Sequence, residues 1–281
     1  MAEETNKTDK TNKKKKKKGS SVLFYIVIIA LIAIAAFSAY KVISIQHEYN
    51  VARRAYDDIA DAANATIPEQ TADPTDDEYE FLDLDWDAIK AESPNAVAWL
   101  KCNGTVINYP VALGTDNEFY LTHLVNGDWS GSGSLFVDYR QTDPFTGSFN
   151  TIIYGHRMRN GTMFSCLGKY FFEEGYWENN KCMELYTPNG DYIVEIFAAI
   201  YADANDGYVY KLDWENEDAS ARQEFLDYIS SNNSMLGYDG SVSVTPDDHI
   251  IMMSTCQHST GDARLLVFGK LVPRTETTGT N

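Results

Sequence analysis

Two residues near the end of the chain have types and spacing suited to nucleophilic chemistry. Cys256 follows the apolar segment 249–255, and a polar segment then leads to Arg264, where another apolar run begins. If the two apolar segments pair as a hairpin, the thiol and the guanidinium lie at neighbouring strand ends. A nearby cation favours the thiolate, which is the nucleophilic form of cysteine, and arginine can also donate to a developing oxyanion. The pattern predicts covalent catalysis by Cys256 with Arg264 beside it.

A thiol nucleophile also needs a group that accepts and returns a proton, and histidine is the usual one. His156 follows the apolar run 151–154, so it lies at another expected strand end. His258 lies two residues beyond Cys256, although neighbours in a turn often point apart. His123 is a third candidate. The residue types alone leave these three histidines open.

The other three cysteines lack a cation at a neighbouring strand end. Cys102, Cys166 and Cys182 are interpreted as small buried apolar side chains, and disulfide bonds among the four cysteines remain an alternative. The sequence contains no C-x-x-C pair and no closely spaced Cys/His set typical of structural zinc. We therefore expect no metal and no cofactor.

The N-terminal part of the chain has the composition of a membrane anchor. Lysines at 7, 10 and 13–18 precede residues 19–40, which carry no charge. At the rise of an α-helix, such a segment covers about 33 Å, enough to cross a hydrocarbon layer of about 30 Å. The lysines predict a cytoplasmic N-terminus and an extracellular remainder in the cell membrane, in a single-pass topology. A cleaved signal peptide and a buried core helix are the alternatives.

The overall composition excludes two broad classes of protein. Hydrophobic residues make up 44% of the 281 residues and aromatic residues 13%, which is incompatible with a wholly disordered chain. The formal net charge is −18 although lysines crowd the N-terminus, so the rest of the chain is strongly acidic. Nucleic-acid binding depends on cations that face phosphates, and we expect none here.

The pattern of apolar runs predicts a mainly β domain over residues 83–272. Before it we expect a cytoplasmic basic segment (1–21), a transmembrane helix (22–40) and a stalk or linker (41–82) that is helical to about Ala65. A polar tail (273–281) follows. An amphipathic helix is expected at 217–231 and a short one at 85–92. Eight runs of strand length favour a barrel or a sandwich: 96–100, 106–112, 134–139, 151–154, 182–186, 192–201, 249–254 and 264–272.

Several motifs together resemble the sortases, and class B sortases in particular. Ile153-Tyr-Gly-His-Arg-Met158 resembles the sortase histidine motif, and Met252-Met-Ser-Thr-Cys256 followed by Arg264 resembles the T-L-x-T-C motif and downstream arginine. The segments 109–111, 116–121 and 132–138 resemble class B segments, and the helix at 217–231 resembles the class B insertion. The Met252-Met253 pair departs from the usual Thr-Leu, which bears on substrate fit more than on chemistry.

The resemblance implies an eight-stranded sortase β-barrel with peripheral helices and a cysteine transpeptidase of Gram-positive type. It implies cleavage of a C-terminal sorting signal of secreted proteins after Thr, with transfer to an amine of a peptidoglycan precursor or to a pilin lysine. His156 would be the acid/base, and Arg264 would stabilise the oxyanion and substrate. A hydrolytic cysteine peptidase and a membrane-tethered adhesion module are the alternatives. The residues implied in substrate binding are Asn117, Leu121, Tyr154, Tyr208, Val209 and Ser254.

Overall fold

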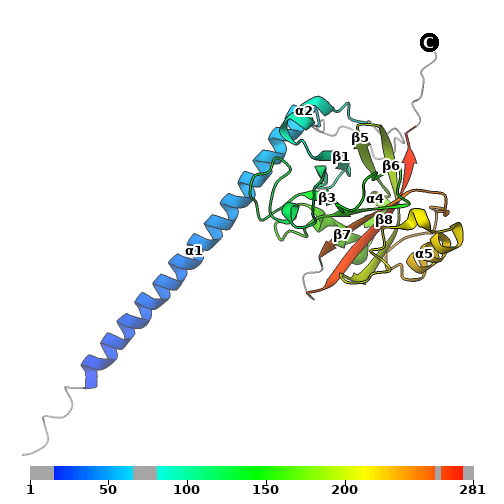
Figure 1. Ribbon diagram of the computed structural model, residues 1–281. Coiled ribbons are helices and arrows are strands. Elements are labelled where there is room, and N and C mark those ends of the chain that lie inside the picture. The colour runs from blue at the N-terminus through cyan, green and yellow to red at the C-terminus, as the bar shows by residue number, and fades with distance from the viewer. Residues whose placement is uncertain (1–15, 66–80, 257–260, 275–281) are drawn as a thin grey trace, which may run out of the picture. The chain divides into compact units, whose positions relative to one another are not determined.

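The computed structural model describes residues 16–65, 81–256 and 261–274 (Figure 1). Its strands are β1 (Ala96–Lys101), β2 (Asn108–Leu113), β3 (Leu135–Val137), β4 (Asn150–Tyr154), β5 (Cys182–Thr187), β6 (Gly190–Asp203), β7 (Ile250–Cys256) and β8 (Ala263–Pro273). The α-helices are α1 (Lys16–Ala62), α2 (Trp86–Glu92), α3 (Lys169–Phe172), α4 (Tyr176–Asn179) and α5 (Ala219–Ser231). Three short 3₁₀ helices are η1 (Phe119–Leu121), η2 (Phe164–Gly168) and η3 (Trp214–Asn216).

The strands form one closed barrel in the order β1-β2-β3-β4-β7-β8-β6-β5. The β2–β3 and β4–β7 pairs are parallel, and the other pairs are antiparallel. Among the described strands, closure leaves no unpaired sheet edge, so the barrel avoids the edge pairing to which an open sheet is prone. The predicted mainly β fold with an eight-stranded barrel is confirmed.

Two hydrophobic cores use opposite faces of the same strands. On β7, Ile251 and Met253 belong to the larger core, whereas Ile250 and Met252 belong to the smaller one. This alternation follows from the two-residue period of side chains along a strand. The smaller core is closed by α5, which contributes Phe225 and its neighbours over β6, β7 and β8. From Ile250 to Thr255, β7 is therefore buried on both faces.

Helix α1 divides between two compact units, residues 1–50 and 51–281. In the described part of the chain, it contains the one helical segment long and apolar enough to cross a membrane. That segment begins at Val22, and its mean hydropathy reaches 2.8. Its large apolar side chains are exposed, for example Leu23 at 63% and Ile29 at 66%. A water-soluble helix would bury such side chains, so the composition fits a lipid-facing segment.

The last turns of α1 belong to the barrel unit. Ala52, Tyr56 and Ile59 are buried in the larger core. The Tyr56 hydroxyl donates to the carbonyl oxygen of Gly133 at 2.8 Å and lies 3.0 Å from Ser134 Oγ. The sequence of residues 41–82 predicts only a stalk or linker, so this packing against the barrel does not follow from it.

Candidate active site

The position of Cys256 follows from the pairing of β7 with its two neighbours. In the antiparallel β7–β8 pair, Cys256 lies directly opposite Arg264. In the parallel β4–β7 pair, Tyr154 lies beside Ser254. His156 follows Tyr154 by two residues, and Cys256 follows Ser254 by two residues. Parallel strands end at the same edge of a sheet. The backbone thus brings the expected nucleophile, the histidine and the arginine to one end of three adjacent strands.

Gly155 allows β4 to end tightly before His156. A Cβ atom at this position would lie 2.4 Å from Leu135 Cδ2 and 2.5 Å from Phe164 Cδ2. The Gly155 N–H donates to the Ser254 carbonyl at 3.1 Å, and the Phe164 N–H donates to the His156 carbonyl at 2.9 Å. The close approach requires glycine, and the two hydrogen bonds fix the backbone that carries the histidine.

The imidazole of His156 is oriented by a backbone carbonyl. Its Nε2 lies 2.7 Å from the carbonyl oxygen of Leu121. A carbonyl oxygen only accepts, so Nε2 carries the proton in this contact and Nδ1 is the acceptor of the neutral ring. A histidine held in this way has one nitrogen available for proton transfer.

Arg264 retains a net positive charge at the site. Its Nη1 donates to the carbonyl oxygens of Gly261 and Ala263, each at 3.2 Å. Among the described residues, no carboxylate lies within ion-pair distance of this guanidinium. The remaining donors can therefore serve a bound peptide or an oxyanion.

A cavity of about 320 Å³ opens at this end of the barrel. Six residues predicted from the sequence line it: His156, Arg264, Asn117, Leu121, Tyr154 and Ser254. The other lining residues are Phe136, Arg140, Gly155, Ala204, Tyr210 and Thr255. The structure thus brings most of the expected binding residues to the two expected catalytic side chains.

Two predicted binding residues do not line this cavity. Val209 is fully buried in the smaller core, and the Tyr208 ring packs against Phe225 and Tyr228 instead. The cause is a turn in which Asp206 Oδ1 accepts from the backbone N–H groups of Tyr208 and Val209. This turn directs Tyr208 towards α5 and buries Val209, so neither residue faces the cavity.

Tyr210, which is not among the residues expected from the sequence, lines the cavity. Its hydroxyl lies 2.8 Å from Ser254 Oγ, and its ring stacks on Tyr154 with centroids 6.3 Å apart. The resemblance to sortases implies a binding residue in this segment, and the turn at Asp206 determines which tyrosine faces the cavity.

The other candidate histidines and thiols lie elsewhere. His123 does not line the cavity; its ring stacks on Phe119, with its Nδ1 2.9 Å from the Phe119 carbonyl oxygen. His258 lies outside the described residues. Burial raises the pKa of the Cys102 thiol to about 12 and also raises that of Cys166. Neither thiol has the character of a nucleophile.

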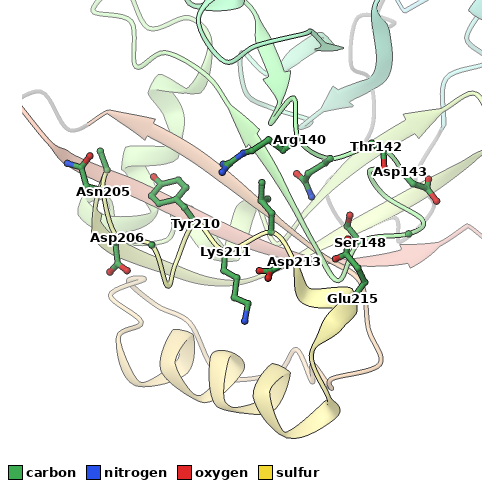
Figure 2. Close-up of a pocket in the computed structure, with 15 residues that line it drawn as sticks. Arg140, Thr142, Asp143, Ser148, Asn205, Asp206, Tyr210, Lys211, Asp213 and Glu215 are labelled. Carbon is green, nitrogen blue, oxygen red and sulfur yellow. The ribbon is translucent and has the colours of Figure 1, made fainter.

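A second cavity of about 660 Å³ adjoins the first and shares Arg140, Ala204 and Tyr210 with it. Figure 2 shows it, with Asp206 and Tyr210 on one side and Thr142 and Asp143 on the other. Asp213 and Glu215 add two further carboxylates. The lysine of this cavity, Lys211, pairs with Glu217, and Arg140 pairs with Asp138. The lining is therefore acidic.

Comparison with known proteins places the chain in a family. A family model described as the sortase domain matches residues 100–272. Sortase B of Listeria monocytogenes is 33% identical over 180 residues, which cover 63% of this chain and 70% of that protein. Sortase B of Staphylococcus aureus is 31% identical over 189 residues, which cover 66% of this chain and 74% of that protein.

The similarity extends to three dimensions. A solved complex of Staphylococcus aureus sortase B with substrate superposes with a TM-score of 0.60 at 29% identity, covering 67% of this chain and 85% of that one. The chain therefore belongs to the sortase family of cysteine transpeptidases. Within that family it is a class B sortase.

Proposed function

We propose that this sortase is a membrane-anchored transpeptidase that cleaves a C-terminal sorting signal of secreted proteins after Thr and transfers the acyl group to an amine. The pairing of β7 carries the proposal, because it aligns Cys256 with Arg264 on one side and with the strand of His156 on the other.

In the proposed reaction, the Cys256 thiolate attacks the carbonyl carbon of the Thr residue. The carbonyl π electrons move to oxygen, and Arg264 donates hydrogen bonds to the resulting oxyanion. When the tetrahedral intermediate collapses, the C–N bond breaks, and protonated His156 gives its proton to the leaving amine. An incoming amine then attacks the thioacyl carbon and loses a proton to His156, and Cys256 leaves as the thiolate.

Asn117, Leu121, Tyr154 and Ser254 are proposed to bind the sorting peptide in the cavity of about 320 Å³. Tyr210 replaces Tyr208 and Val209 in this role, since it reaches Ser254 and stacks on Tyr154. The mixture of aromatic and polar groups suits an extended peptide, whose backbone needs partners while its side chains need apolar contacts.

The proposed acceptor is an amine of a peptidoglycan precursor or a pilin lysine. The adjoining acidic cavity supports this choice, since carboxylates attract a cationic amine and the two cavities share a wall. The segment from Val22 is proposed to anchor the protein in the cell membrane as a single span. The lysine-rich N-terminus would lie in the cytoplasm and the catalytic domain outside.

The test is incubation with a Pro-x-Thr-Gly or Pro-x-Thr-Asn peptide, with and without an added amine. A transpeptidase joins the acyl part to the amine, a hydrolytic peptidase ignores the amine, and an adhesion module leaves the peptide intact. Mass spectrometry should find the acyl group on the fragment that contains Cys256. Cys256→Ala should be inert, whereas the control Cys182→Ala should keep its activity. An adduct on another residue, or cleavage by Cys256→Ala, contradicts the proposal.

A further inference from the structure

Asp138, directly after β3, has a carboxylate that no part of the proposed reaction uses. Its side chain has no exposed surface. Three side chains donate hydrogen bonds to it: Asn117 through Nδ2 at 3.0 Å, Tyr154 through its hydroxyl at 3.0 Å, and Arg140 through Nε at 2.8 Å and Nη2 at 2.7 Å. A buried carboxylate is costly unless such donors surround it.

The three donors come from separate parts of the chain, yet all three line the cavity of about 320 Å³. Asp138 itself does not line it. Asn117 is held at both ends, because its Oδ1 also accepts from the backbone N–H of Tyr139 at 3.0 Å. The carboxylate thus decides which way the amide faces and where the phenol is anchored.

Arg140 donates the most strongly oriented hydrogen bonds to Asp138. Its Nε and Nη2 form a two-pronged pair with the carboxylate, while 51% of its side chain stays exposed at the wall that the two cavities share. The planar fork fixes the guanidinium, and its other N–H groups remain for carbonyl oxygens of a peptide. Since Asp138 neutralises Arg140, Arg264 supplies the net positive charge at the nucleophile.

We propose that Asp138 is a positioning residue for peptide binding, which acts by holding Asn117, Tyr154 and Arg140 in the orientation that a sorting peptide needs. The inference rests on the proposed function. Burial alone would raise the pKa of this carboxyl, but the hydrogen bonds from Arg140 and Asn117 outweigh burial and hold the pKa below its ordinary value. The group is therefore ionised at neutral pH and remains an acceptor for all three donors.

The test compares Asp138→Asn with Glu184→Gln in the full-length protein. Glu184 is an equally buried carboxylate that accepts from Lys101, Asn103 and Tyr186, and it lies outside the cavity. An asparagine at 138 replaces one acceptor oxygen of the carboxylate by an NH2 group, so that a donor of the side chain then faces a donor of its neighbours. We expect KM for the peptide to rise about tenfold or more in Asp138→Asn, with kcat within about threefold of wild type. Glu184→Gln should lower the melting temperature but keep the KM.

A second readout separates positioning from general damage. Asn117→Ala should raise KM in the wild type but add little in the Asp138→Asn background, since both changes remove the same orientation. Rescue of KM by Asp138→Glu, in part or in full, would also support the proposal.

Four results would overturn the inference. They are an unchanged KM in Asp138→Asn, an equal rise of KM in Glu184→Gln, fully additive effects with Asn117→Ala, or a loss confined to kcat. If Asp138→Asn does not fold, Tyr154→Phe decides the question. It removes one donor and keeps the ring, and an unchanged KM then contradicts positioning. If the wild type itself consumes no sorting peptide, the proposed function fails instead.

Discussion

At the scale of single residues, the surroundings of each thiol set its reactivity. Cys102 is enclosed by the barrel and has a pKa of about 12, so its thiol stays protonated at neutral pH. Cys256 ends a strand opposite an arginine that lacks a carboxylate partner among the described residues. A neighbouring cation favours the thiolate. We therefore expect Cys256, and not Cys102, to be the reactive thiol.

The first prediction concerns the acid/base. His156→Ala should lower kcat by roughly 10²–10⁴-fold, the usual value of general acid–base assistance. His258→Ala should keep most of the activity, and His123→Ala serves as a matched control because its ring packs on Phe119 away from the cavity. Steady-state turnover of a sorting peptide measures all three. A larger loss in His258→Ala than in His156→Ala would reverse the assignment.

The second prediction concerns the geometry of Arg264. Lysine keeps the charge but lacks the planar set of donors. Arg264→Lys should still bind the peptide, with kcat lower by about 10²-fold or more if an oxyanion donor is lost. A kcat close to that of wild type would reduce Arg264 to a general electrostatic role.

At the scale of elements, what the sequence could predict depended on how local the signal was. Apolar runs of strand length bounded by turn signals located the eight strands of the barrel, and the spacing of Phe225 and Ile229 located α5. Tyr210 lines the cavity and Tyr208 does not because of one turn built by Asp206. The periodicity of the sequence does not predict this turn. The packing of Tyr56 depends on a contact with Ser134, far along the chain, so a local pattern could not contain it.

The third prediction tests the end of α1 as part of the barrel. Tyr56→Ala removes a buried ring, its contact with Tyr109 and two hydrogen-bonding contacts. The free energy of unfolding should fall by about 3 kcal/mol. Denaturant unfolding of a chain that starts at residue 46 measures it, with Val51→Ala as the control because Val51 is 50% exposed. Equal effects of the two changes would mean that α1 does not stabilise the barrel.

At the scale of the whole molecule, charge and hydropathy are distributed along the chain in a definite order. Lysines come first, an uncharged apolar helix follows, and the acidic catalytic domain comes last. This order supports the proposed orientation, in which positive charge stays on the cytoplasmic side.

The fourth prediction tests that orientation. External protease added to intact protoplasts should release the catalytic domain by cutting within residues 66–80, a polar segment with two prolines. Immunoblotting for the domain measures its release, and a cytoplasmic protein serves as the control for intact membranes. Full protection of residues 81–281 would show the opposite orientation.

The order of strands in the barrel has a consequence for how the protein is made. Synthesis proceeds from the N-terminus, so β7 and β8 are completed last. They fill the place between β4 and β6, which have unpaired edges until then. Cys256 and Arg264 belong to this final segment. A chain that is cut short therefore lacks both the proposed nucleophile and a closed barrel, and the finished chain acquires them together.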